Sequence, residues 1–249
     1  MIMPSGIRRL DHKEITYASN LDKAEEVGRI CGLFDQIHPL QRKIKFLLDI
    51  RGYVKVNDLK GDYAEFGSYQ SEMQYAAYHI LNPVDKIGKY IGLDSFDKSL
   101  KFTEEDARHN TYEEESDFLC DYDSVNKFIS EYIGEKGVLI KGDFRDREVR
   151  GEFRSSCDKV AISVIDCNLL SSTHDALEMT FSRIISGGVI FLDDMFTNFS
   201  HGQPCILNAF KKYAKRYQFE CIDYSTYPPF SKAFIVYSTK QEIREMYIS

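Results

Sequence analysis

Residues 187–194 read Gly-Gly-Val-Ile-Phe-Leu-Asp-Asp, and this stretch decides the fold class. Its four central residues are all apolar, which favours a strand covered on both faces, as in a parallel sheet. The glycine pair closes a helix that we expect over residues 173–185. Ligands of such sheets bind beyond the carboxyl ends of the strands, so Asp193 and Asp194 are the first candidates for a functional site.

Strands and helices alternate on both sides of this stretch. The pattern predicts an α/β fold: a doubly wound, mostly parallel, seven-stranded sheet whose last two strands form an antiparallel pair through Pro228-Pro229. The expected strands cover residues 63–67, 89–96, 137–144, 159–166, 189–192, 219–224 and 233–237. The expected helices cover residues 71–81, 124–133, 173–185 and 204–217, with a weak helix or loop at 146–155.

The N-terminal part reads as a helical extension (residues 1–55) to a main domain (residues 56–249). Apolar residues recur at helical spacing over Leu21–Leu33 and Leu40–Ile50. We expect Pro39 to separate two helices here. Gly52 should end the second of them.

The charge of the chain is concentrated in one segment. Residues 97–123 carry ten acids against three bases, and the difference equals the net charge of −7 of all 249 residues. Such a run is a solvated loop or frayed helix in the plain interpretation, and a mobile lid over a ligand site in the functional one. An acidic chain also lacks the basic face that nucleic acid binding needs, so we expect no nucleic acid partner.

Cysteine spacing and hydropathy exclude further classes. The six cysteines show no C-x-x-C pair, which argues against a zinc site and a disulfide framework and favours a reduced, cytoplasmic protein. No apolar run approaches the roughly 20 residues of a membrane-spanning helix. We therefore expect no membrane partner.

Polar turns follow the first three strands. They read Glu65-Phe66-Gly67-Ser68-Tyr69, Asp94-Ser95-Phe96 and Gly142-Asp143-Phe144. Gly67 permits a tight turn close to a ligand, and a carboxylate at the second strand end can accept hydrogen bonds from ribose hydroxyls. A single glycine is a poor dinucleotide fingerprint, so NAD is disfavoured, whereas S-adenosylmethionine (SAM) has no pyrophosphate and needs only such a turn. Simple packing by Gly67 and capping by Asp94 or Asp143 are the alternative interpretations.

Three carboxylates follow the next two strands. Asp166 ends the fourth strand, and Asp193 and Asp194 end the fifth. Neighbouring strand ends lie close together, and three like charges in one crevice repel one another without a cation. A hard divalent ion with oxygen ligands, most naturally Mg²⁺, resolves this repulsion. The alternative is that Asp193 caps a turn and Asp194 is solvated.

These motifs resemble one known family. They are Glu65-x-Gly67, Asp94-Ser95-Phe96, Gly142-Asp143-Phe144, residues 166–173 (Asp-Cys-Asn-Leu-Leu-Ser-Ser-Thr) and residues 187–194. Together they are similar to the macrocin O-methyltransferases, which are class I, SAM- and Mg²⁺-dependent enzymes that methylate sugars of antibiotics. The resemblance covers roughly residues 60 to 217.

The resemblance implies a set of site residues. The metal ligands would be Asp166, Asp193 and Asp194. The cofactor-binding residues would be Glu65, Gly67, Ser68, Tyr69, Asp94, Ser95, Asp143, Phe144 and Asp166. The acidic segment would be a lid over the acceptor, and the helical N-terminus would help build the acceptor pocket or a dimer interface. Three positions depart from the family pattern: Asn168, Leu170 and Met195. Because of these departures, we expect no more specific acceptor than a hydroxyl of a sugar or sugar-containing compound.

The sequence thus predicts a cytoplasmic, homo-oligomeric SAM-dependent O-methyltransferase in which Mg²⁺ or another divalent cation positions and acidifies an acceptor hydroxyl. Candidates for the base that removes the hydroxyl proton are Asp166, His201 and His109. A metal-independent methyltransferase of the same fold and a non-catalytic SAM-binding protein are the rival interpretations. A nucleotide-sugar dehydratase or reductase is disfavoured because the glycine-rich turn is too poor.

Overall fold

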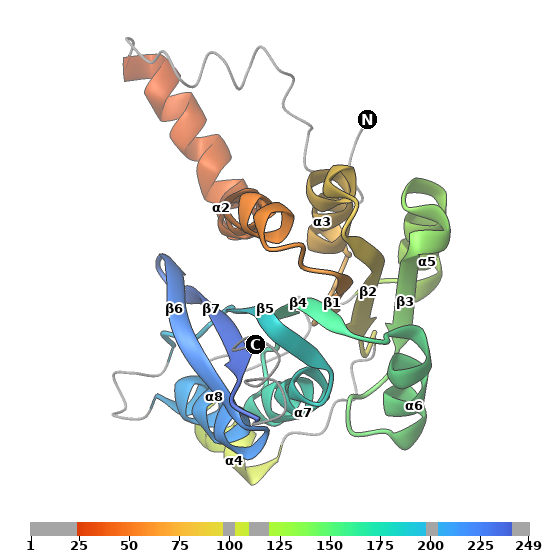
Figure 1. Cartoon of the computed structure of the whole chain (residues 1–249). Helices are drawn as coiled ribbons and strands as arrows, with labels where there is room; N and C mark the ends of the chain where they lie inside the picture. The colour runs from red at the N-terminus through yellow and green to blue at the C-terminus, as the bar shows by residue number, and fades with distance from the viewer. Residues whose placement is uncertain (1–23, 97–102, 110–119, 198–203, 241–249) are drawn as a thin grey trace.

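The computed structural model describes residues 24–96, 103–109, 120–197 and 204–240. A seven-stranded sheet forms the centre, with the order β3-β2-β1-β4-β5-β7-β6 (Figure 1). The strands are β1 (Gly61–Phe66), β2 (Ile87–Asp94), β3 (Gly137–Lys141), β4 (Val160–Ile165), β5 (Ile184–Leu192), β6 (Phe219–Tyr227) and β7 (Ser231–Ser238). Neighbouring strands from β3 to β5 pair in parallel, while β7 pairs antiparallel with both β5 and β6. The expected fold class is therefore confirmed.

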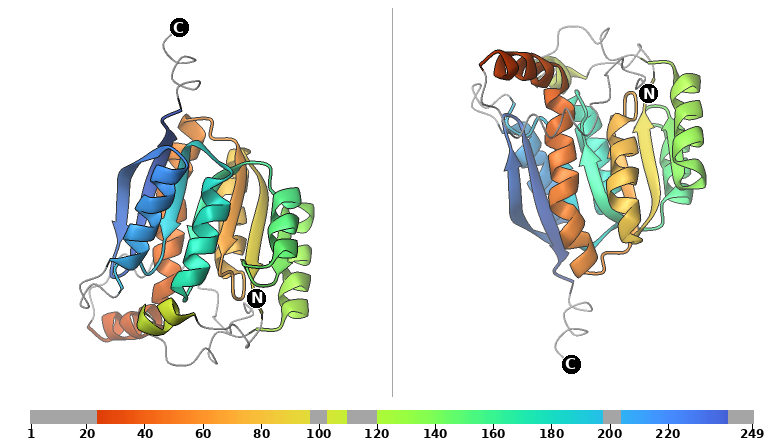
Figure 2. Two further views of the ribbon diagram at one scale, coloured as in Figure 1. Left: turned by 90° about the horizontal axis from the view of Figure 1, so that it is seen from below. Right: turned by 90° about the horizontal axis from the view of Figure 1, so that it is seen from above.

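Helices cover both faces of the sheet (Figures 1 and 2). One face carries α2 (Ala24–Val56), α3 (Glu72–Leu81) and α5 (Tyr122–Tyr132), and the other carries α6 (Arg147–Ser156), α7 (Leu170–Phe181) and α8 (Cys205–Arg216). Short 3₁₀ turns at Asn82–Val84 and Gly134–Lys136 lead into β2 and β3. Two separate clusters of buried apolar side chains result, one on each face, so the sheet is buried on both sides as its apolar strands predicted. Among the described helices, none combines the length and apolarity that crossing a membrane requires.

The N-terminal helices differ from the expectation. A single helix, α2, runs through both Pro39 and Gly52. It changes direction between its two halves (Figure 2), and Pro39 near its middle accounts for this, because proline has no N–H to donate to the helical hydrogen-bond pattern. The helix continues past Gly52 because its second half is fixed to the sheet by buried side chains, among them Leu47, Ile50 and Val54. Packing thus outweighs a glycine penalty of about 1 kcal/mol. The proposed domain boundary after residue 55 falls within the last turn of α2 and stays a prediction.

The bounds of α7 and the start of β5 also differ from the expectation, and the two differences are connected. The helix expected over residues 173–185 is α7, which begins at Leu170 and ends at Phe181. Strand β5 then begins at Ile184, because Ile184 already pairs with Val160 of β4, and it runs through the glycine pair that we expected to be a helix stop. The weak element at 146–155 is a true helix, α6, whose Val149 and Phe153 are buried. The acidic segment, which we expected to be a solvated loop or a frayed helix, contains one short helix, α4 (Glu104–His109).

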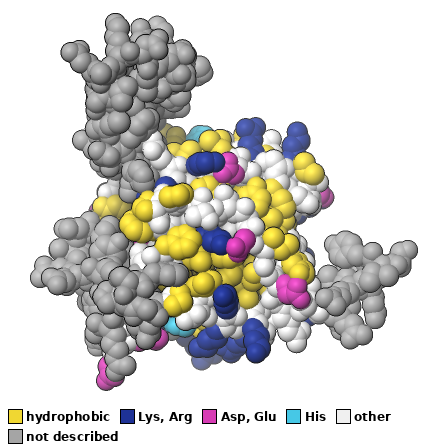
Figure 3. Space-filling view, turned by 90° about the vertical axis from the view of Figure 1, so that its left-hand side faces the viewer, with side chains coloured by type: hydrophobic (Ala, Val, Ile, Leu, Met, Phe, Trp, Pro, Cys, Tyr) yellow, Lys and Arg dark blue, Asp and Glu magenta, His cyan; other side chains and the backbone are white. Residues whose placement is uncertain are grey.

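Strand β6 forms one edge of the sheet. Figure 3 looks onto this side of the molecule, where hydrophobic side chains gather with lysines and arginines among and below them. Ile222 of β6 and Leu48 of α2 are among the most exposed large hydrophobic side chains of the described residues. The site-forming end of the sheet lies elsewhere, at the carboxyl ends of β1, β2, β4 and β5.

Candidate active site

The acids that follow β4 and β5 lie next to each other. The two strands pair in register up to Ile165 and Leu192, so the next residues, Asp166 and Asp193, leave the sheet side by side. Their backbones stay anchored to the neighbouring strands, because the Asp193 N–H donates to the Ile165 carbonyl at 2.9 Å and the Asp166 N–H donates to the Phe66 carbonyl at 2.9 Å. Asp193 is 6% exposed. The strand register therefore produces the closeness of these acids that the sequence suggested.

A lysine from α2 lies between the two carboxylates. The Lys43 ammonium forms an ion pair with Asp166 and lies 3.6 Å from Oδ2 of Asp193. Phe46 and Leu47, one helical turn further on, are fully buried against the sheet. Residues three and four apart share one face of a helix, so the packing of these two side chains directs Lys43 at the strand ends. Sequence reasoning missed Lys43, although a lysine on the apolar stripe of a helix signals a buried acidic partner.

Asp193 is held from a second side by β7 and α2. The Ser231 hydroxyl donates a hydrogen bond to Oδ1 of Asp193, and Nη2 of Arg42 lies 3.4 Å from the same oxygen. Nε of Arg42 also donates to Oγ of Ser231 at 3.3 Å. Both oxygens of Asp193 thus face donors, and its carboxylate is fixed in one orientation. The sequence carried no signal for Ser231, because β7 reaches this place only through the antiparallel return.

The electrostatics of the cluster differ among the three acids. Burial would raise the pKa of Asp193, but Lys43, Ser231 and Arg42 hold it below its ordinary value. Burial raises the pKa of Asp166 despite the pull of Lys43. Burial and the charges of Asp193 and Asp166 raise the pKa of Asp194 to about 7. Asp194 is therefore the acid that most lacks a cation at neutral pH.

Whether these acids suit a metal depends on chemistry and on arrangement. Three carboxylates are the oxygen donors that hard divalent cations take, and Asp194 is short of positive charge. Within the described residues, however, no three His, Cys, Asp or Glu side chains are arranged around a common point as metal ligands. Lys43 lies between Asp166 and Asp193 instead. The donor set fits a divalent cation on the condition that Lys43 withdraws.

Strand β1 delivers a buried acid to the same region. Glu65 is 2% exposed and accepts a hydrogen bond from the Tyr63 hydroxyl at 2.8 Å. Burial raises the pKa of Glu65 to about 8, against the opposing charge of Lys43. The next turn needs Gly67, which has a φ of +85°, and a Cβ there would press into the Asp166 carbonyl oxygen. Gly67 thus lets the ends of β1 and β4 approach each other, and Glu65 lies ready for a positively charged group.

The turn after β1 holds several buried polar atoms without partners. Within the described part of the chain they include Oγ of Ser68 and Ser71, Oε1 of Gln70 and Oε1 of Glu72. Tyr69 and Ser71 also have left-handed backbones, with φ of 47° and 58°. Buried polar groups are normally hydrogen-bonded, and backbone strain of this kind gathers at ligand sites. The residues present therefore fit a polar ligand that binds between β1 and α3.

Asp94 at the end of β2 borders this turn. Its carboxylate accepts hydrogen bonds from the Tyr69 N–H at 2.8 Å and from the Phe96 N–H at 3.1 Å. Burial nevertheless raises its pKa. The N–H and the hydroxyl of Ser95 also interact with this carboxylate, so the ribose hydroxyls that we expected Asp94 to meet would share it with these donors.

Asp143 and Phe144, the two residues expected around an adenine, have different surroundings: Asp143 forms an ion pair, and Phe144 packs in the core. Asp143 follows β3 and is paired with Arg145, whose Nε donates to both carboxylate oxygens at 3.0 and 2.9 Å. A ligand amino group would share Asp143 with this arginine. Phe144 is a core residue, 6% exposed and packed edge-to-face on Phe66 at 5.6 Å, so little of its ring remains for a cofactor.

The two histidine candidates for the base cannot be placed. His201 lies outside the described residues, and His109 ends α4 with its side chain likewise outside the description.

The acidic segment is anchored near the site. Asp106 is 1% exposed and accepts hydrogen bonds from the N–H of Ser171 at 2.9 Å and from its hydroxyl at 2.7 Å. Helix α4 thus caps the start of α7 from outside, and Asp106 is not part of a solvated run.

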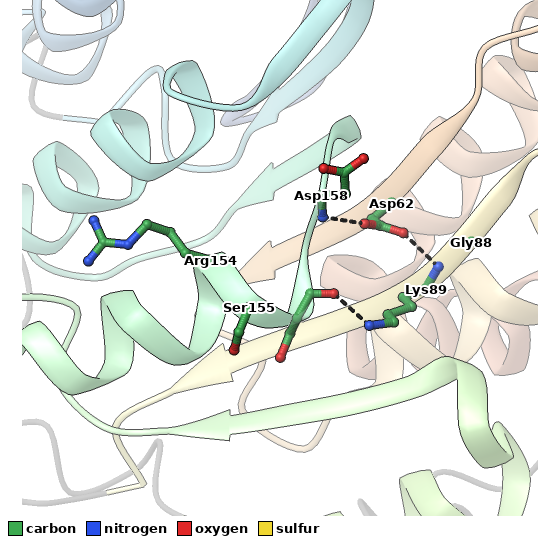
Figure 4. Close-up of a pocket in the computed structure, with 7 residues that line it drawn as sticks. Asp62, Gly88, Lys89, Arg154, Ser155 and Asp158 are labelled. Atoms are coloured by element: carbon green, nitrogen blue, oxygen red, sulfur yellow. Dashed lines mark hydrogen bonds between the residues drawn. The ribbon is translucent and has the colours of Figure 1, made fainter.

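A pocket of about 450 Å³ lies at the opposite, amino-terminal end of the strands (Figure 4). Its central acid, Asp62, accepts hydrogen bonds from the N–H of Lys89 at 2.9 Å and of Asp158 at 3.1 Å. Nζ of Lys89 donates to the Ser156 carbonyl at 2.9 Å, and Arg154 extends away from this group. These polar groups satisfy one another, so the pocket ties strand starts together and is no rival to the site at the strand ends.

Comparisons with known proteins identify the family and similar folds. A family model described as macrocin O-methyltransferase (TylF) matches residues 41–218. The structure of the O-methyltransferase NovP is similar, with 19% identity, 80% of each chain covered and a TM-score of 0.62. The calicheamicin methyltransferase CalS11 has 16% identity, 90% of each chain covered and a TM-score of 0.59. No curated protein matches the sequence.

Proposed function

We propose an acceptor and an ion requirement for this chain. It belongs to the macrocin O-methyltransferase family, as its motifs suggested, and is a SAM-dependent methyltransferase. We propose that it methylates a hydroxyl of a sugar or sugar-containing natural product, and that a divalent cation, Mg²⁺ by preference, assists. One structure of CalS11 is described as a TDP-rhamnose 3'-O-methyltransferase, and this likeness of fold supports a sugar acceptor.

One observation carries the proposal. The polar turn after β1, with its unpartnered buried oxygens, lies directly beside the acid cluster after β4 and β5. Glu65 belongs to both regions, because its pKa responds to burial, Lys43, Asp166 and Asp94. A methyl donor and an oxygen acceptor must meet in line, and two adjacent polar sites at a topological switch point satisfy that need.

The residues of the first site suit SAM. When bound, SAM supplies an activated methyl group on its sulfonium. Ser68 and Ser71 offer hydroxyls to the amino-acid part, and Glu65 offers a carboxyl group whose ionisation a bound ammonium group would favour. Asp94, at the end of β2, is the acceptor that we assign to ribose hydroxyls. The backbone N–H groups at the start of α3 add donors for a carboxylate.

Asp166 is the base that we assign to the acceptor hydroxyl. It lies half-buried at the boundary of the two sites, and desolvation raises its pKa, which favours accepting a proton. Asp193 stays ionised and holds its orientation through Ser231 and Arg42. His201 and His109 remain further candidates from the sequence.

Asp166, Asp193 and Asp194 would hold the divalent cation. A cation bound there would acidify and orient the acceptor hydroxyl. Support comes from the donor chemistry of the three acids and from the raised pKa of Asp194. The rival is a metal-independent reaction in which Lys43 alone supplies positive charge to these acids. A cytoplasmic location and a homo-oligomeric state stay predictions.

Substitution of the acids separates these possibilities. We expect Asp193→Ala and Asp194→Ala to weaken Mg²⁺ binding in calorimetry and to lower methyl transfer, while SAM still raises the melting temperature. Asp158→Ala, which removes an exposed acid at the amino end of the sheet, is the matched control. Undiminished turnover of both variants in the presence of a chelator would exclude the metal. Stabilisation by NAD but not by SAM would refute the proposed function itself.

A further inference from the structure

The ammonium group of Lys43 is the charged group in the site that the proposed function leaves without a task. It forms an ion pair with Asp166 and lies 3.6 Å from Asp193, where both acids offer an Oδ2 atom. These acids are also two of the three that we assign to the divalent cation. We propose that Lys43 is a displaceable internal cation: it holds the Asp166–Asp193 pair while no metal is bound, and a divalent cation binds by taking its place. The inference rests on the proposed function, since it concerns the same carboxylates.

The position of Lys43 is built into the fold. Phe46, one turn later on α2, packs on Phe191 of β5 with ring centroids 4.7 Å apart and on Tyr227 of β6 at 5.9 Å. Leu47 and Ile50 are fully buried beside it. The helix backbone is therefore fixed at this point, and Lys43 can leave the carboxylates only by turning its own side chain.

The remaining contacts of the cluster would survive such an exchange. Ser231 and Arg42 contact Oδ1 of Asp193, whereas Lys43 is near Oδ2. Removal of Lys43 thus exposes one oxygen on Asp166 and one on Asp193 and leaves the orientation of Asp193 in place. Ser231 and Arg42 are positioning residues in this scheme, because they act through Asp193.

Charge favours the exchange when a dication is present. Asp194, which directly follows Asp193, adds a third acid to the cluster. A divalent cation brings twice the charge and accepts more than two oxygen ligands. In the metal-free protein, Lys43 reduces the repulsion between Asp166 and Asp193 and so stabilises the empty cluster.

Calorimetry on Lys43→Met tests the competition directly. An opposite charge at this range changes the proton affinity of a carboxylate by roughly 1–3 pKa units, so removal of Lys43 should tighten Mg²⁺ binding by about tenfold or more. The matched control is Lys45→Met on the same helix, since Lys45 is 67% exposed and pairs with Asp49 at 2.8 Å. Mg²⁺ affinity of Lys43→Met equal to or weaker than that of the control would overturn the inference.

Amine labelling of the unmutated protein gives a second test that does not depend on how the variant folds. Lys43 and Lys45 are acetylated with a mild reagent and counted by mass spectrometry with and without Mg²⁺. We expect Mg²⁺ to raise labelling of Lys43 severalfold and to leave that of Lys45 unchanged. Unchanged Lys43 labelling at saturating Mg²⁺ would show that no displacement occurs.

The two proposals fail in different ways. Equal Mg²⁺ affinity in the unmutated protein and in Lys43→Met would refute displacement and leave the metal-assisted reaction intact. Absence of Mg²⁺ binding in both proteins, with methyl transfer from SAM continuing, would refute displacement and the metal requirement together. Mg²⁺ binding to Lys43→Met but not to the unmutated protein would refute displacement, because Lys43 would then be a permanent cation that Mg²⁺ does not replace.

Discussion

Removal of the Asp106 carboxylate tests how the acidic segment is joined to the rest of the molecule. In Asp106→Ala, Ser171 at the start of α7 loses the acceptor for both its N–H and its hydroxyl. Thr103 loses the acceptor for its N–H at 2.9 Å and for its hydroxyl at 2.7 Å, which dismantles the reciprocal cap of α4. Both helix starts are thus weakened by one substitution.

The size of the effect follows from these contacts. Loss of one helix cap costs about 0.5–2 kcal/mol, and Asp106 serves two helices while it is almost fully buried. We expect the free energy of unfolding to fall by about 2–3 kcal/mol, which corresponds to a melting temperature lower by about 4–12 °C for a chain of this size. Urea unfolding followed by circular dichroism measures the first quantity, and calorimetry measures the second.

The pH dependence provides an internal check. Burial opposes ionisation, but the hydrogen bonds from Ser171 and Thr103 keep the pKa of Asp106 below its ordinary value of 3.8. A lowered folded-state pKa stabilises the protein above the ordinary value and loses this effect as the pH falls through the folded-state value. The difference between Asp106→Ala and the unmutated protein should therefore shrink in acid. Glu105→Ala, an exposed neighbour on α4, is the control. A stability loss within about 0.5 kcal/mol of that control would refute the argument.

Three other predictions concern the site and its support. Gly67→Ala should destabilise the protein by about 3 kcal/mol or more, because the φ of +85° and the Asp166 carbonyl both exclude a side chain. Gly52→Ala should instead stabilise α2 by up to about 1 kcal/mol, because nothing lies within 4 Å of the added Cβ. Thermal unfolding of the two variants measures the difference. The raised pKa of Glu65, about 8 against 4.5, means that the folded state binds the extra proton, so stability should fall as the pH rises from 4.5 to 8, and Glu65→Gln should flatten this slope in unfolding experiments across that range. Ser231→Ala should leave SAM binding unchanged but weaken Mg²⁺ binding measured by calorimetry, because Asp193 loses a contact that fixes its orientation; Mg²⁺ affinity equal to that of the unmutated protein would contradict this role.

The sequence predicted most of the sheet because its strands carry clear apolar runs. The closeness of Asp166 and Asp193 also followed from the sequence, since neighbouring parallel strands end at the same edge. Lys43 could not be placed, because hydropathy does not say where α2 crosses the sheet. Its position on the stripe of Phe46 and Leu47 was the available signal.

Local rules failed where packing decided the outcome. The glycine pair before Val189 looked like a helix stop, yet it lies within β5 because pairing with β4 begins at Ile184. Asp106 looked like one of many solvated acids, and only its contact with Ser171, 65 positions away, explains its burial. Contacts of such range depend on the tertiary arrangement, which no short sequence window contains.

The division of the interior into two layers has a practical consequence for engineering. Successive residues of β5 belong to different layers, since Val189 and Phe191 face the side of α2, whereas Ile190 and Leu192 face the side of α7 and α8. Combinatorial libraries can therefore be restricted to one layer at a time. Changes at Phe191 would alter the packing of α2, the helix that carries Lys43. Changes at Ile190 would leave α2 in place and alter only the packing of α7 and α8.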